Sequence, residues 1–210
     1  MKNAAKGSVG SRFTIRLHSK RTYDLLNPKN HEFSIYDIAF ALSRLCRFVG
    51  HSPGYSVAQH SYYVSQVADR GYDSPMNAMW GLLHDASEAY LGDVSKNLKR
   101  SPVMREYRKL EKRTMREIAR QFGLSWPIPK VVQAADFEMG NFEVNTFLGK
   151  SESNLVWSPE EARKRFLERY HSLSSKMSTP SKLKKAARQL SLFPEGESEG
   201  PHSPSPQEAA

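Results

Sequence analysis

The sequence predicts a mostly α-helical fold with a small β-ribbon near its N-terminus. Apolar residues recur every three or four positions along several segments, strict apolar–polar alternation is confined to one short stretch, and Pro, Gly and Ser separate the segments. Most apolar residues lie between about Phe13 and Tyr170, whereas the C-terminal stretch is rich in Ser, Pro, Lys and Glu. We therefore expect one globular domain, residues 12–175, followed by a basic helix and a flexible tail, residues 176–210.

The elements follow in order along the chain. Alternation at Phe13, Ile15 and Leu17, with a return after a turn at 19–20, predicts the β-ribbon. The helical pattern begins at Ser34 and lasts until the glycines at 50–54. Further helices are expected over 57–70, 74–91, 102–122, 131–148, 158–173 and 181–190.

Polar residues occupy inward positions of three of these predicted helices. His60 follows Ser-Val-Ala-Gln, His84 and Asp85 follow Leu-Leu, and Asp136 follows Ala-Ala. Burying imidazoles and carboxylates among aliphatic side chains is costly unless each is paired, and a shared divalent cation would satisfy all four. Each residue alone has an ordinary structural explanation, such as a hydrogen-bonded core histidine or a helix cap. The combination of His, His-Asp and Asp on three helices points to a metal site.

The same segments resemble the HD-domain superfamily of phosphohydrolases. His-Asp-Ala-Ser-Glu-Ala-Tyr-Leu-Gly-Asp at 84–93 and Glu-Tyr-Arg-Lys-Leu-Glu-Lys at 106–112 are similar to segments of bacterial 5′-deoxynucleotidases. The stretch 42–61, which includes Tyr-Ser-Val-Ala-Gln-His-Ser, resembles small phage and prophage HD-domain nucleotide hydrolases still more closely. The resemblance covers about residues 12–150. It implies an HD-domain helical bundle.

A site of two imidazoles and two carboxylates suits one divalent transition metal, namely Zn, Mn, Co, Ni or Fe. Glu88 is one turn beyond His84 on the predicted helix 74–91, and so would face the same side. The resemblance gives Glu88 and Asp93 catalytic roles, in activating water and in handing a proton to the leaving oxygen. The structural alternatives are that Glu88 only orients His60 and that Asp93 only caps a turn.

The resemblance also assigns substrate contacts. Arg47 matches the phosphate-binding arginine of deoxynucleotidases, where a guanidinium clamps phosphate through two parallel hydrogen bonds. Lys99 is the second basic candidate. Phe48 stands where that family has Trp beside the sugar, which weakens any transfer of sugar selectivity. The alternative for both basic residues is ordinary surface charge.

These features favour a metal-dependent enzyme that hydrolyses nucleotide phosphates, either a 5′-deoxynucleotidase or a dNTP phosphohydrolase that acts on dATP-like substrates. One alternative is an HD-domain phosphodiesterase that acts on a cyclic nucleotide or an alarmone. No histidine lies between Asp85 and Asp136, which argues for one metal ion. The other alternative is a non-catalytic, nucleotide-binding accessory protein of replication.

The chain carries a formal net charge of +9, and its basic residues are concentrated at 99–120 and 176–188. Such surfaces attract anions, although a solvated helix face is the simpler explanation. The pentapeptide Gln189, Leu190, Ser191, Leu192 and Phe193 resembles the motif that docks replication proteins on the β sliding clamp, and it could instead fold back on the domain. Cys46 is the only cysteine, and neither a secretory signal nor an apolar run of membrane-spanning length is present. We expect a cytoplasmic protein without membrane contact, and the sequence leaves open whether it forms a homo-oligomer.

Overall fold

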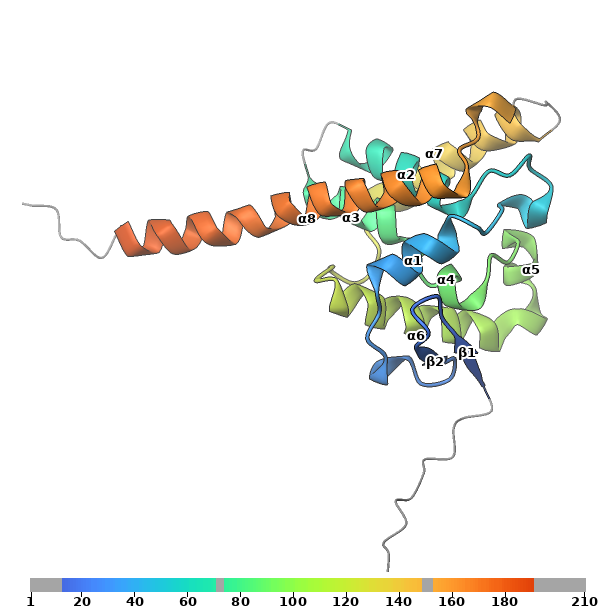
Figure 1. Ribbon diagram of the computed structural model, residues 1–210, viewed down its shortest axis with the longest axis horizontal. Helices are drawn as coiled ribbons and strands as arrows, with labels where there is room; N and C mark the ends of the chain where they lie inside the picture. Colours follow the sequence, from blue (N-terminus) through green and yellow to red (C-terminus); the bar gives the residue numbers. More distant parts are fainter. Residues whose placement is uncertain (1–12, 71–73, 149–152, 191–210) are drawn as a thin grey trace, which may run out of the picture. The chain divides into compact units, whose positions relative to one another are not determined.

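The computed structural model of the protein describes residues 13–70, 74–148 and 153–190. The chain divides into two compact units, Met1–Met177 and Ser178–Ala210. The described part is mostly helical, with one two-stranded antiparallel sheet near its N-terminal end, which confirms the predicted fold class (Figure 1). None of its helices combines the length and the apolar character needed to cross a membrane.

The ribbon is formed by β1 (Thr14–Arg16) and β2 (Thr22–Asp24), with Ile15 opposite Tyr23. Lys20, in the turn between them, takes a positive φ of 65°. Tyr23 is fully buried, and its hydroxyl lies 3.1 Å from the Thr114 hydroxyl on α6 (Arg105–Gln121). The ribbon is thereby tied to a helix that lies far away in the sequence.

The other helices of the first unit surround an apolar core that includes the fully buried Trp80, Ile38 and Phe166. They are α1 (Ile35–Leu42), α2 (Val57–Asp69), α3 (Pro75–Leu83), α4 (Glu88–Leu91), α5 (Lys96–Arg100), α7 (Lys130–Phe147) and the N-terminal part of α8 (Pro159–Leu190).

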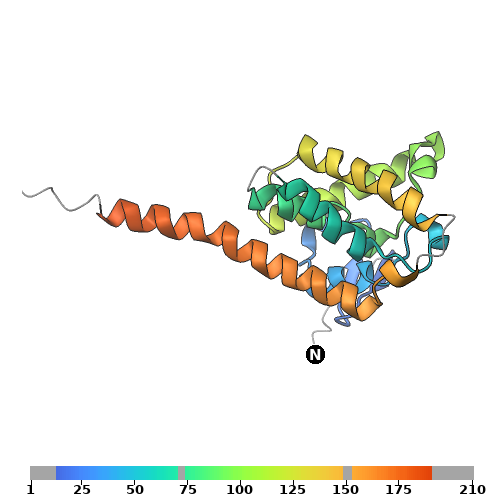
Figure 2. The same ribbon diagram turned by 90° about the horizontal axis from the view of Figure 1, so that it is seen from above.

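Three helices, α2, α3 and α7, pack against one another and form the scaffold of the site (Figures 1 and 2). Gly81 makes the close approach of α3 to α2 feasible. A Cβ atom at this position would lie 2.8 Å from the Cα and 2.9 Å from the N of Ser65 on α2. Only glycine fits at that distance, so the sequence brings the C-terminal end of α3 directly against α2.

The predicted helix over 74–91 is wrong, because the chain leaves the α-helix at His84 and resumes it only at Glu88. Between α3 and α4 the backbone makes tighter bonds, from Ala86 N to Leu83 O at 3.0 Å and from Glu88 N to Asp85 O at 2.9 Å. These bonds span three residues rather than four. The sequence predicted that Glu88 and His84 share one α-helical face, and the structure shows that they do not.

The two helices expected at 158–173 and 181–190 are one element in the structure, α8. Its residues from Ser178 onward belong to the second unit. The clamp-like motif at 189–193 lies outside the residues whose side chains the structure describes. That expectation therefore stays a prediction.

Candidate metal centre

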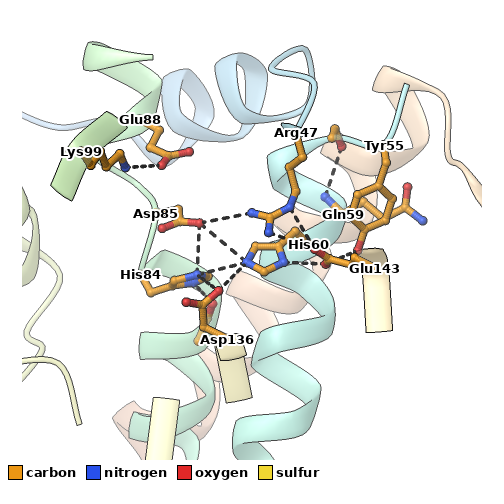
Figure 3. Close-up of polar contacts among 12 residues, drawn as sticks. Arg47, Tyr55, Gln59, His60, His84, Asp85, Glu88, Lys99, Asp136 and Glu143 are labelled. Carbon is orange, nitrogen blue, oxygen red and sulfur yellow. Dashed lines mark hydrogen bonds and ion pairs between the residues drawn. The ribbon is translucent and has the colours of Figure 1, made fainter. Parts of the chain in front are cut away.

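The structure brings the four predicted metal ligands to one point (Figure 3). His60 lies on α2, His84 and Asp85 follow α3, and Asp136 lies on α7. The two Nε2 atoms are 3.3 Å apart, Asp136 Oδ1 is 3.2 Å from His60 Nε2, and Asp85 Oδ2 is 3.1 Å from His84 Nε2. Each carboxylate also lies 3.7 Å from the other imidazole. His60, His84 and Asp85 form a cluster that could hold a metal ion, and Asp136 contacts both of its imidazoles.

The hydrogen bonds on the far side of each ring fix which nitrogen faces the cluster. His84 Nδ1 lies 2.7 Å from the carbonyl oxygen of Gly81, which can only accept, so this nitrogen carries the proton. His60 Nδ1 lies 2.6 Å from Glu143 Oε1 and donates to that carboxylate. In the neutral rings both Nε2 atoms therefore present lone pairs to each other.

In this neutral form, four acceptor atoms face one another at 3.1–3.7 Å and repel unless a proton or a metal cation lies between them. Protein nitrogen and oxygen ligands bind transition metals at about 2.0–2.2 Å, so atoms around one ion are separated by roughly 3.0–3.5 Å. The spacing and the chemistry of the donor set therefore fit a single divalent metal ion.

The electrostatics of the cluster also favour a positive charge at its centre. Burial lowers the pKa of His84, but Asp85 and then Asp136 outweigh it and hold that pKa well above 6.5. Burial raises the pKa of Asp136, and the hydrogen bonds with both imidazoles more than reverse this effect. The pKa of Asp85 is held low in the same way, chiefly by His84. When no metal ion is bound, the proton that His84 retains supplies the positive charge that the two carboxylates of this buried site require.

Sequence reasoning missed one residue of the site, Glu143. Its side chain is fully buried, and it accepts hydrogen bonds from His60, from the Tyr55 hydroxyl at 2.8 Å and from Arg47 Nε at 3.0 Å. Burial raises its pKa, but the contacts with His60 and Arg47 keep it below the ordinary value. Glu143 thus orients His60, the role that the structural alternative gave to Glu88. The spacing of seven residues from Asp136 places both carboxylates on one face of α7, a signal that the sequence does contain.

The residues predicted for catalysis and substrate binding also come together. One cavity of about 450 Å³ adjoins Asp85 and Asp136. Its lining includes all five of the predicted residues, Arg47, Phe48, Glu88, Asp93 and Lys99.

Glu88 is nearly buried, and its two oxygens differ. Oε1 accepts from Lys99 Nζ at 3.0 Å, whereas Oε2 has no hydrogen-bond partner among the described residues. Burial, and then the charge of Asp85, raise the pKa of Glu88 well above its ordinary value, although Lys99 opposes them. Burial also raises the pKa of Asp93. Lys99 also donates to a second carboxylate, because its Nζ lies 2.7 Å from Oε1 of Glu111.

Arg47 is positioned by the same carboxylate that orients His60. Its Nη2 lies 2.9 Å and its Nε 3.0 Å from Glu143 Oε2, and its Nη1 is 3.8 Å from Asp85 Oδ2 (Figure 3). The guanidinium is therefore held beside the cluster, not at a helix C-terminus or on the open surface, with 16% of the side chain exposed. Its contact with Asp85 places a cation next to the candidate metal ligands.

The loop that carries Phe48 is strained. Phe48 and Val49 have φ values of 57° and 55°, a region that costs a non-glycine residue about 1–2 kcal/mol. The loop is closed at its base by the bond from Arg47 N to Tyr55 O at 2.9 Å. Both strained residues line the cavity, and Val49 is largely exposed. The loop therefore presents apolar side chains at the rim of the metal site.

Comparison with known proteins places the chain in a family. No family model matches it. It is 33% identical over 148 residues to the uncharacterized protein RCAP_rcc00048 of Rhodobacter capsulatus. This alignment covers 66% of this chain and 74% of the relative. It is also 37% identical over 118 residues to the uncharacterized protein YfdR of Escherichia coli (strain K12). This alignment covers 56% of this chain, and the chain spans 61% of the length of YfdR. The chain belongs to the same family as RCAP_rcc00048.

Proposed function

We propose that the protein is a metal-dependent phosphohydrolase of the HD-domain type that acts on deoxynucleotides. The observation that carries this proposal is the convergence of the Nε2 atoms of two imidazoles and two carboxylates beside a cavity that also holds Arg47 and Lys99. Metal ligands and basic side chains in one cavity suit a phosphate group, which is the substrate class that the resemblance to 5′-deoxynucleotidases implies.

His60, His84, Asp85 and Asp136 would hold one transition-metal ion, which supplies Lewis-acid polarisation of a phosphoryl oxygen and a lower pKa for water. Glu88 has the properties of a general base, because its raised pKa and its unpartnered Oε2 suit it to orient water and to accept a proton.

Two other residues complete the proposed reaction. Asp93, whose pKa is also raised, would donate a proton to the leaving oxygen. Arg47 would hold the phosphate beside Asp85 with the nitrogen that Glu143 leaves free. The two carboxylic acids thus divide the proton transfers, while Arg47 binds and orients.

The nucleoside has a suitable surface in the same cavity. A volume of about 450 Å³ is within the range of pockets for small ligands. Phe48, Val49, Phe137 and Val144 line it, and Phe137 is 63% exposed although it directly follows Asp136. Aromatic and aliphatic groups beside a phosphate site favour a substrate with a flat, uncharged part, such as a nucleobase.

Two measurements test the proposal. Metal analysis should find about one transition-metal ion per chain, and both His84→Ala and Asp85→Ala should abolish metal binding and turnover. Glu88→Gln should keep the metal and lose most of the rate. Glu138→Gln, a matched exposed carboxylate on α7, should change neither.

A screen of deoxynucleotides and ribonucleotides with Mn, Co, Ni, Zn and Mg, in which the nucleoside product is measured together with released orthophosphate and tripolyphosphate, identifies the substrate. Faster turnover of deoxynucleotides is expected. Activity on cyclic nucleotides or alarmones alone would overturn the proposed substrate class and support the phosphodiesterase alternative. Metal binding without turnover of any nucleotide would overturn the enzymatic proposal and leave a binding module.

A further inference from the structure

A second cavity, of about 390 Å³, also adjoins the metal cluster. Asp85 and Lys99 line both this cavity and the one that holds Phe48 and Phe137, so the two share part of a wall. The second cavity is otherwise lined by different residues, among them Arg108 and Lys112 of α6 and Trp126. A substrate phosphate at Asp85 would have open space on both sides.

The basic residues on the wall of the second cavity differ in their partners. Lys99 forms ion pairs with Glu88 and with Glu111, which also lines this cavity. Arg108 donates instead to the carbonyl oxygens of Lys99 and Ser101, so its charge meets no carboxylate among the described residues.

Lys112 makes no hydrogen bond or ion pair with any residue that the structure describes, and it lies one turn from Arg108 on the same face of α6. Two like charges at this spacing destabilise a helix slightly unless an anion lies between them. The wall therefore offers two cations that have no anionic partner within the described part of the chain.

We propose that this second cavity binds the distal phosphates of a nucleoside triphosphate, while the α-phosphate lies at the metal cluster and the nucleoside occupies the first cavity. The inference rests on the proposed function and names its substrate class, the triphosphates. The other candidate occupant is the nucleobase, through Trp126. That ring already packs on Trp80, with centroids 6.2 Å apart, and lies under Arg116 at 5.5 Å. Arg108 and Lys112, which have no carboxylate partner among the described residues, therefore favour phosphate as the occupant.

Equilibrium binding of inorganic tripolyphosphate tests the proposal without any need for turnover. Affinities for tripolyphosphate, orthophosphate and an uncharged deoxynucleoside are measured by calorimetry, with free Mn²⁺ held constant because polyphosphate itself binds divalent cations. The variant is Lys112→Gln. The control is Lys109→Gln, which makes the same charge change on the exposed side of α6, where Lys109 pairs with Glu106.

Lys112→Gln should raise the Kd for tripolyphosphate about fivefold, as expected for one partly screened charge contact, and change the Kd for orthophosphate less than twofold. Lys109→Gln should change neither. Equal effects of the two variants on tripolyphosphate would overturn the proposal. So would a loss of deoxynucleoside affinity in Lys112→Gln, because the cavity would then hold the base.

Kinetics separate this inference from the proposed function. If a deoxynucleoside monophosphate is hydrolysed but Lys112→Gln leaves both the tripolyphosphate Kd and the KM for triphosphates unchanged, the second cavity is not a phosphate site and the proposed function stands. If no nucleotide is hydrolysed but tripolyphosphate binding depends on Lys112, the phosphate site stands and the proposed function fails.

Discussion

Replacing Glu143 by Gln tests how the site is built, because this one buried carboxylate joins His60, a proposed metal ligand, to Arg47, the proposed phosphate-binding residue. Oε1 accepts from His60 and Tyr55, and Oε2 accepts twice from Arg47. A glutamine has the same shape but only one acceptor oxygen, so one of these two pairs must face an N–H group.

Either orientation of the amide is costly. If its nitrogen faces Arg47, two charge-assisted hydrogen bonds are lost, at about 1.5–3 kcal/mol each. If it faces His60, that ring can accept only by moving its proton to Nε2, where the metal is expected to bind. We expect a loss of about 3 kcal/mol in the free energy of unfolding and, at about 2–4 °C per kcal/mol, a fall in Tm of roughly 6–12 °C. Disturbing a group that orients a metal ligand should weaken Mn²⁺ binding about 10- to 100-fold.

Calorimetric titration of the metal-free protein with Mn²⁺, together with melting curves, measures both effects. Glu138→Gln is the matched control, because its carboxylate lies on the same helix in an exposed pair with Arg70. If Glu143→Gln is poorly folded, Tyr55→Phe removes a single bond to Glu143 and should weaken Mn²⁺ binding in the same direction by a smaller factor. A folded Glu143→Gln protein with an Mn²⁺ Kd within twofold of wild type would refute the role assigned to Glu143.

Two further predictions concern the scaffold and the pH dependence. Gly81→Ala should lower stability by about 1–3 kcal/mol, because its Cβ would meet the Ser65 backbone at 2.8 Å, whereas Gly140→Ala, with nothing within 4 Å, should raise stability by up to about 1 kcal/mol. Melting curves that rank the two variants in the opposite order would contradict this packing. The rate of the proposed hydrolysis should rise with pH through the pKa of Glu88, because the proposed base acts in its deprotonated form and its pKa is raised above the ordinary value. Lys99→Met removes a cation that lowers this pKa, so the acidic limb of the pH–rate profile should move to higher pH, and a shift to lower pH would exclude Glu88 as the base.

Local patterns predicted the elements that build the scaffold. The helices expected at 57–70, 102–122 and 131–148 correspond to α2, to α6 with the short turn before it, and to α7, and the ribbon is also where alternation placed it. Such segments have strong periodicity and clear Pro or Gly boundaries, which are local properties of a chain. The candidate metal ligands were predicted in the same way, because polar residues stand out among the apolar positions of amphipathic helices.

The sequence failed where a local pattern competed with tertiary contacts. Residues 74–91 read as one helix, but the His84 ring bonds back to the carbonyl of Gly81, and the backbone tightens through Asp85 before α4 begins. In this conformation the side chains of His84 and Asp85 both point toward His60 on α2. The apolar periodicity continues across this break, and no proline or glycine lies at residues 84–87 to mark it.

The sequence by itself determined the helical class, the ribbon and the identity of four residues that suit a metal. Only the tertiary structure decided their partners. Glu143 emerged as the residue that orients His60 and positions Arg47, and Glu88 became a partner of Lys99. The physical reason is that amphipathic patterning depends on neighbours three or four residues apart. A hydrogen bond between buried side chains instead depends on how separate helices pack, and its two residues can lie far apart in the sequence, as Glu143 and His60 do.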